Sequence, residues 1–167
     1  RLLLKPLIFG GGHENGMRSG TENVPAIVGF GVACELAKLR EAETAKHVQQ
    51  LREHLEQGLI EMGAEIFGRD AARIPNTCYF AIPDVEGDTL VVRLDKAGFA
   101  VASGAACSSV NPGQSHVLDA MHVSPMLARC AVRVSLGRSN TVAEVDEFLK
   151  ATRQIVEALR QMNGITF

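Results

Sequence analysis

The chain has very few of the aromatic side chains that could stack on nucleic-acid bases. Trp is absent, Tyr occurs once, and Phe, Trp and Tyr together make up 5% of the 167 residues. Basic residues are not in excess either, because the net charge at pH 7 is −2. Surfaces that bind single strands combine stacking aromatics with a positive groove. The composition therefore predicts no direct contact with nucleic acid.

Closely spaced cysteine pairs are also missing. The four cysteines are far apart and form no CxxC pair. Zinc sites and redox motifs commonly use the CxxC spacing. Small secreted domains are usually dense in disulfides. We therefore expect no metal site and a reducing, cytoplasmic compartment. The sequence also has no signal-peptide pattern and no apolar run long enough to span a bilayer, so no membrane contact is predicted.

Apolar residues, by contrast, are abundant enough for a sizeable core. They make up 46% of the chain, and its length fits one domain or slightly more. The chain starts at Arg1 rather than Met and continues directly with an apolar run, Leu2 to Leu4. We expect a fragment of a longer protein.

The segment from Phe99 to Gly113 carries a single thiol among small side chains. Only Ser, Gly and Ala separate Ala102 from Cys107, and Ser108, Ser109 and a turn-forming Asn-Pro-Gly follow. A structural cysteine usually has bulky apolar neighbours that keep it inert. Exposed free thiols are mostly avoided, so the segment is interpreted as a pliable loop with a reactive Cys107. A loop without chemistry is the alternative.

A glycine-rich stretch, GGGHENGMRSGTEN, occupies residues 10–23. Its five glycines let the backbone approach a ligand closely, and backbone amides at the start of a helix suit a phosphate. Arg18, Ser19 and Thr21 could add donors. A glycine-rich connection without a ligand is equally compatible, because the stretch is neither a Walker loop nor a dinucleotide fingerprint.

Two alternating stretches predict strands. Pro75–Ile82 places Cys78, Phe80 and Ile82 on one face, and residues 130–136 place Cys130, Val132, Val134 and Leu136 toward the core. Arg133 then points to the opposite face. A mid-strand arginine is held stiffly, which suits bidentate recognition of a carboxylate. An ordinary solvated arginine is the commoner alternative.

Capping residues and apolar spacing predict the helices. Asn23 is an N-cap for a first helix, and a charged run, 38–46, follows as either a solvated face or a break. A clear amphipathic helix continues to Met62. Ser115 is predicted to cap a short helix, and Thr141 with Glu144 forms a capping box for the last helix.

Three motifs in a fixed order now resemble a known family. They are GGGHENGMRSGTEN (10–23), VASGAACSS (101–109) and VRVSLGR (132–138), and shorter matches, IPN, VEG and SHVLDAM, lie between them. Together they resemble the C-terminal part of the pyridoxal-phosphate-dependent cysteine desulfurases, in the class V aminotransferase group. The resemblance covers essentially the whole chain, and the loop sequence is similar to the branch that serves iron–sulfur assembly.

The resemblance implies an α/β fold. The expected architecture is the α+β small domain of a fold-type I enzyme, with a small mixed sheet packed with helices. Residues 1–30 would be a remnant of the large cofactor-binding domain, and residues 31–167 the C-terminal small domain with the cysteine loop. A homodimer is expected for the complete protein.

The resemblance also implies a role for each matched residue. Cys107 would attack the sulfur of L-cysteine, leaving L-alanine and a persulfide that passes to a sulfur acceptor, a scaffold protein or, transiently, an iron–sulfur cluster. Arg133 would bind the substrate carboxylate. Thr21 would reach the cofactor phosphate of the partner subunit, and Arg18 and His13 lie in the same loop with less defined roles.

The chain departs from the family in one respect. The Schiff-base lysine of the family lies in a Ser/His-rich motif, and none of the five lysines here has that context. The chain alone is therefore expected not to bind pyridoxal phosphate productively and to be inactive. Three alternatives remain: a selenocysteine lyase, another class V aminotransferase-like enzyme that does not need the thiol, and a sulfur-carrier or interaction module that works without the cofactor.

Overall fold

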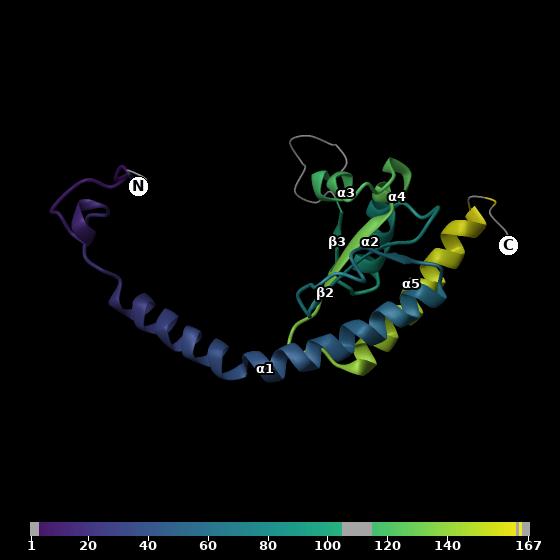
Figure 1. Ribbon diagram of the computed structural model, residues 1–167, viewed down its shortest axis with the longest axis horizontal. Helices are drawn as coiled ribbons and strands as arrows, with labels where there is room; N and C mark the ends of the chain where they lie inside the picture. The colour runs from purple at the N-terminus through teal and green to yellow at the C-terminus, as the bar shows by residue number, and fades with distance from the viewer. Residues whose placement is uncertain (1–3, 105–114, 163, 165–167) are drawn as a thin grey trace. The chain divides into compact units, whose positions relative to one another are not determined.

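The computed structural model describes residues 4–104, 115–162 and 164. The chain divides into two compact units, Arg1–Glu41 and Ala42–Phe167. Figure 1 shows the helices and strands in chain order. The division into residues 1–30 and 31–167 as parts of two domains stays a prediction.

The first unit contains the glycine-rich loop and the first half of a helix. The loop includes a short 3-10 helix, η1 (Glu14–Gly16), and is closed by a parallel bridge between Ile8 and Arg18. Helix α1 (Val24–Glu61) follows. The Asn23 Oδ1 atom accepts a hydrogen bond from the Ala26 amide at 3.2 Å, so the predicted N-cap is confirmed. The apolar side chains of this unit are exposed, Phe9 and Phe30 among them.

Helix α1 is continuous through the charged run. The run was expected to be a solvated face or a break, and the helix shows that the first alternative is right. Ala, Glu, Lys and Leu dominate residues 35–46, and all are good helix formers. The buried side chains of α1 begin at Val48 and recur at helical spacing, at Leu51, Leu55 and Leu59.

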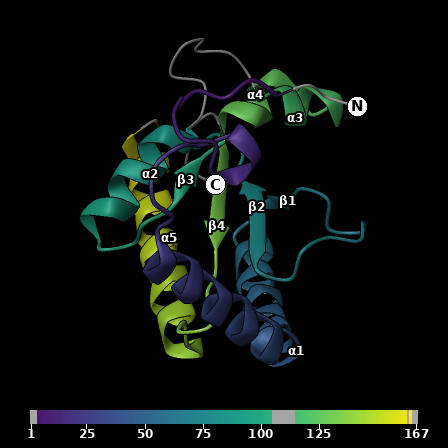
Figure 2. The same cartoon turned by 90° about the vertical axis from the view of Figure 1, so that its left-hand side faces the viewer.

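The second unit is built on a four-stranded sheet with the order β1-β2-β4-β3. The strands are β1 (Glu65–Ile66), β2 (Thr77–Ala81), β3 (Ala102–Ser103) and β4 (Ala131–Ser135), as Figure 2 shows with β4 in the centre. Every pairing is antiparallel, so the expectation of a mixed sheet was wrong. The reason is topological: β2 and β3 run parallel, but β4 is inserted between them and they never pair.

One face of the sheet carries the main core. Helices α1, α2 (Gly87–Lys96) and α5 (Val142–Met162) contribute to this core, and α1 and α5 lie close enough for Gly58 to contact Leu149. Strand residues Cys78, Phe80 and Val132 are fully buried there, which confirms the predicted core face of β2. The Thr141–Glu144 capping box is also confirmed, with the Thr141 amide donating to Glu144 Oε2 at 2.8 Å.

The other face carries a smaller cluster beneath two short helices. These are α3 (His116–Ala120) and α4 (Pro125–Arg129). Leu118 of α3 packs in this cluster with Phe67, Ala81 and Ala131. Cys130 belongs to this cluster, whereas the alternation predicted it on the core side. The reason is that β4 starts one residue later, at Ala131, and Cys130 ends α4 with helical backbone angles.

Strand β3 is only two residues long, and Phe99, three positions before it, packs edge-on against Phe148 of α5 at 5.4 Å between ring centroids. The predicted cap of α3 was wrong. Ser115 makes no capping hydrogen bond to α3. Among the described residues, no helix has both the length and the apolar character needed to cross a bilayer.

Candidate functional site

Arg133 lies in the centre of the sheet, on the face that carries α3 and α4. Its neighbours in register are Tyr79 on β2 and Ala102 on β3. Residues directly opposite one another in antiparallel strands point to the same face, so Arg133 stands beside the strand that leads toward Cys107. Arg133 is exposed, and no carboxylate of the described residues forms an ion pair with it. Its guanidinium is therefore free to donate hydrogen bonds to the carboxylate of a ligand.

Cys107 lies outside the described residues, and so does the rest of segment 105–114. The described residues on either side of this segment are Gly104, which follows β3, and Ser115, which precedes α3. Ala102 is directly opposite Arg133 and precedes Cys107 by only five positions. The strand pairing thus places Arg133 next to the start of the segment that carries the thiol.

The glycine-rich loop brings the other predicted residues together. The Arg18 guanidinium donates to the Thr21 carbonyl oxygen at 3.2 Å, and the Ser19 hydroxyl donates to the Phe9 carbonyl at 2.7 Å. His13 Nδ1 lies 2.9 Å from Glu22 Oε1. The hydrogen bond with His13 is the main cause that lowers the pKa of Glu22. His13 therefore already has an anionic partner inside the loop.

The donor set of this loop fits a phosphate group. Thr21 is exposed, and its hydroxyl forms no hydrogen bond with another described residue. The Arg18 guanidinium, also exposed, lies beside the Thr21 carbonyl. Hydroxyl and guanidinium donors at a glycine-rich turn before a helix suit a phosphate. Thr21 and Arg18 fit this role better than His13, whose ring is bonded to Glu22.

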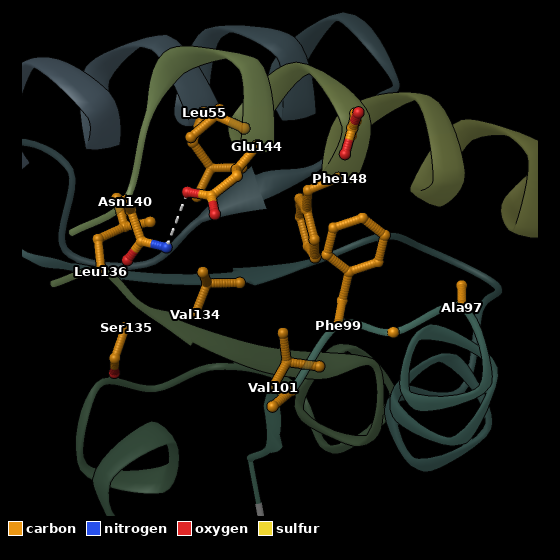
Figure 3. A pocket seen from close by; sticks show the side chains of 14 residues that line it. Leu55, Ala97, Phe99, Val101, Val134, Ser135, Leu136, Asn140, Glu144 and Phe148 are labelled. Carbon is orange, nitrogen blue, oxygen red and sulfur yellow. Dashed lines mark hydrogen bonds between the residues drawn. The ribbon is translucent and has the colours of Figure 1, made fainter.

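A hollow on the opposite side of the sheet is not part of this site. It has a volume of about 470 Å³ and lies on the α5 side of the sheet. Figure 3 shows Phe99 and Phe148 facing each other in it, with Asn140 hydrogen-bonded to Glu144. None of the predicted site residues lines it. Arg133 points to the opposite face, because neighbouring strand residues alternate.

Sequence reasoning missed two groups of residues that make contacts between distant parts of the chain. The first is Tyr79, which contacts residues on both sides of segment 105–114. The second is a buried charge cluster, Arg52, Glu56 and Arg73, between α1 and the connection to β2. The four-residue spacing of Arg52 and Glu56 was the available signal. Tyr79 contacts residues that are far away along the chain, so no local sequence pattern indicates these contacts.

The buried thiol of Cys78 is chemically different from a reactive cysteine. Burial raises its pKa to about 12, and the nearby Glu56 carboxylate acts in the same direction. The described cysteines Cys34, Cys78 and Cys130 are free, and burial also raises the pKa of Cys130. The thiolate is the nucleophilic form, so neither Cys78 nor Cys130 can do the chemistry expected of Cys107.

We predict a pH dependence of stability from Cys78. Its pKa is higher in the folded state than the usual value of 9.0, so the stability it contributes is complete below pH 9 and is lost as the pH rises toward 12. Between pH 9 and 10 the free energy of unfolding should fall by about 1 kcal/mol on this account. Urea denaturation of the chain and of Cys78→Ala measures it. The same fall in both would contradict the assignment.

The chain matches known proteins along most of its length. Residues 9–148 match the family model of aminotransferase class V. A cysteine desulfurase of Gluconacetobacter diazotrophicus is 46% identical over 162 residues, covering 96% of this chain and 40% of that protein. The cysteine desulfurase IscS 1 of Archaeoglobus fulgidus is 38% identical over 163 residues, covering 97% of this chain and 43% of that protein.

Solved structures agree with these matches. A NifS-like protein superposes with a TM-score of 0.80 at 41% identity, covering 93% of this chain and 39% of that chain. A NifS-like protein from Rickettsia africae gives a TM-score of 0.79 at 34% identity, covering 93% of this chain and 41% of that chain. The chain thus spans about two fifths of the length of these relatives. It belongs to the aminotransferase class-V family and, within that family, is similar to the cysteine desulfurases.

Proposed function

We propose that the complete protein is a cysteine desulfurase that removes sulfur from L-cysteine, and that this chain supplies its nucleophile and its carboxylate-binding residue. The observation that carries the proposal is the pairing of Arg133 with Ala102, five positions before Cys107. The similarity to cysteine desulfurases supports the same assignment. These relatives favour it over a selenocysteine lyase, a thiol-independent aminotransferase or a cofactor-free carrier.

In this proposal each residue has a defined task. Arg133 binds the substrate carboxylate and so orients the amino acid. The Cys107 thiolate donates an electron pair to the substrate sulfur, and an S–S bond forms as the C–S bond breaks. The bonding pair stays on carbon, which takes up a proton and becomes the methyl group of L-alanine. The sulfur remains on Cys107 as a persulfide, which an acceptor thiol can remove.

Pyridoxal phosphate is the cofactor that we propose for the complete protein. Thr21 and Arg18 would hold its phosphate, with Thr21 reaching the cofactor of the partner subunit and His13 in an accessory position. When bound, the cofactor would supply an electron sink for the substrate carbon atoms. The lysine that anchors it would come from outside this chain, since none of the lysines here lies in a matching motif.

We further propose a cytoplasmic homodimer that delivers sulfur to a scaffold protein in iron–sulfur cluster assembly. The exposed apolar side chains of residues 4–41, Ile27, Phe30 and Leu39 among them, support association, because contiguous apolar surface is usually covered. The free thiols of Cys34, Cys78 and Cys130 support a reducing compartment.

The reaction can be distinguished from simple amino-group transfer in the complete protein. With L-cysteine we expect equal amounts of L-alanine and of sulfide released by a reductant. Transfer of the amino group to a 2-oxo acid without sulfide release would contradict the proposal. The two products can be measured in the same reaction mixture.

Arg133→Lys should weaken substrate binding. A lysine keeps the charge but cannot form the two parallel hydrogen bonds of a guanidinium with a carboxylate. Hydrogen bonds to charged groups contribute more to the binding free energy than hydrogen bonds between neutral groups. We expect the KM for L-cysteine to rise about ten- to hundredfold with a similar kcat, because the carboxylate is bound equally in the ground and transition states. Arg129→Lys, an exposed neighbour at the end of α4, is the control and should keep its KM. An unchanged KM for Arg133→Lys would remove Arg133 from the site.

A further inference from the structure

Tyr79 has an environment that fixes its ring and leaves its hydroxyl protonated. It lies on β2 opposite Arg133 and packs edge-on against Phe67, with 5.2 Å between ring centroids. Burial raises its pKa, although a side-chain hydrogen bond with Ser115 and the charge of Arg133 act in the other direction. At neutral pH the group is therefore a neutral phenol, which can donate one hydrogen bond and accept others.

The backbone at Gly104 comes very close to Ala131 of β4, the neighbouring strand, and to the Tyr79 side chain of β2. Its amide donates to the Ala131 carbonyl oxygen at 2.9 Å, and its carbonyl accepts from the Tyr79 hydroxyl at 3.5 Å. A Cβ atom at this position would lie 2.6 Å from Tyr79 Oη and 2.8 Å from Ala131 Cβ. Only glycine fits without displacement, so the backbone leaves β3 at a fixed place.

Ser115 approaches the same hydroxyl from the other side of segment 105–114. It is half-buried and makes no capping hydrogen bond to α3, although it directly precedes that helix. Its side chain instead interacts with the Tyr79 hydroxyl, and this interaction acts to lower the pKa of Tyr79. A Ser115 hydroxyl that donates to Tyr79 leaves the Tyr79 proton for the Gly104 carbonyl, so one phenol can engage residues on both sides of segment 105–114.

We propose that Tyr79 is a positioning residue whose hydroxyl joins Gly104 to Ser115 and so fixes the two ends of the segment that carries Cys107. The effect on catalysis rests on the function proposed above, whereas the contact itself does not. Catalysis needs reacting atoms held close together. Loosening both ends of the segment should therefore slow sulfur loading on Cys107 and leave the binding of L-cysteine by Arg133 unchanged.

The variant that tests this is Tyr79→Phe in the complete, cofactor-loaded protein. It removes the hydroxyl and keeps the ring that packs on Phe67, so the melting temperature should change little. We expect kcat for L-alanine release to fall about three- to tenfold, as for the loss of one or two hydrogen bonds, with the KM for L-cysteine unchanged. The control is Thr77→Val, which removes a hydroxyl from the same face of β2, where it donates a hydrogen bond to the Asn76 side chain. It should keep both constants.

Amide hydrogen exchange gives a second measurement that does not depend on activity. In Tyr79→Phe the Gly104 amide should exchange about three- to tenfold faster, and in Thr77→Val it should not. Gly104→Ala, which places a Cβ against Tyr79 and Ala131, should lower kcat at least as much as Tyr79→Phe does.

The outcomes separate this proposal from the proposed function. If Cys107→Ala is inactive, the inference requires both the lower kcat and the faster exchange in Tyr79→Phe, and the absence of either overturns it. If Cys107→Ala keeps its activity, the proposed function fails, and the exchange of the Gly104 amide alone decides whether Tyr79 holds the segment.

Discussion

Replacing Cys107 by alanine is expected to lower the rate of L-alanine and sulfide formation by about a thousandfold or more in the complete protein, which is the usual consequence of removing a nucleophile. The substrate would still bind, because Arg133 and the cofactor site are unchanged. The KM for L-cysteine should therefore stay similar. Steady-state kinetics with both products measured would test this.

The matched control for this prediction is Cys34→Ala. Cys34 is a free and exposed cysteine on α1, and it has no part in the proposed chemistry. The control should keep wild-type rates. If Cys34→Ala lost activity and Cys107→Ala kept it, the nucleophile would have been assigned to the wrong residue.

Replacing Glu56 by glutamine is expected to lower the free energy of unfolding more than any other substitution proposed for this chain. Its carboxylate accepts hydrogen bonds from Arg73 at 2.6 and 2.9 Å and lies 3.4 Å from Arg52 Nε. Glu56 is 5% exposed and Arg52 8%, so a neutral glutamine would deprive a buried guanidinium of its buried counter-charge. Removing one partner of a buried ion pair usually costs about 3–5 kcal/mol. We expect about 3 kcal/mol here, because Arg73 is partly accessible to water.

Glu53→Gln provides the control for that measurement. Its carboxylate lies 3.9 Å from the same Arg52, but the Glu53 side chain is 56% exposed. Exposed ion pairs contribute about 0–1 kcal/mol, so urea denaturation should show a small change. Equal losses for the two variants would mean that burial of the Glu56 pair has no special importance. Because Arg52 also donates to the Ile74 carbonyl at 3.0 Å, the cluster holds the connection that leads into β2 and Tyr79.

Sequence periodicity predicted the parts of the fold in which one face of an element is buried. The alternation in β2 correctly placed Cys78 and Phe80 in the core, and the helical spacing in α1 did the same for Leu51 and Leu55. Both patterns are local and reflect which face avoids water. The position of Arg133 on the opposite face followed from the same alternation, and the pairing of β4 with β3 explains why Arg133 lies beside the strand that precedes Cys107 in the sequence.

Sequence periodicity could not predict contacts that depend on strand order. The insertion of β4 between β2 and β3 makes the sheet antiparallel and brings Tyr79 to Gly104, 25 positions away. Ser115 was interpreted as a helix cap because its neighbours fit that local rule, but a tertiary partner, Tyr79, hydrogen-bonds its side chain instead. The Arg52–Glu56–Arg73 cluster was missed because charged residues on a helix usually face water.

The decisive measurement for the sulfur transfer is the mass of the Cys107 peptide after the complete protein has reacted with L-cysteine and its free thiols have been alkylated. We predict that this peptide gains one sulfur atom, while the peptides that contain Cys34, Cys78 and Cys130 gain none. Sulfur found on another cysteine, or L-alanine formed with no sulfur on Cys107 at any time in a single turnover, would show that this thiol does not receive the substrate sulfur.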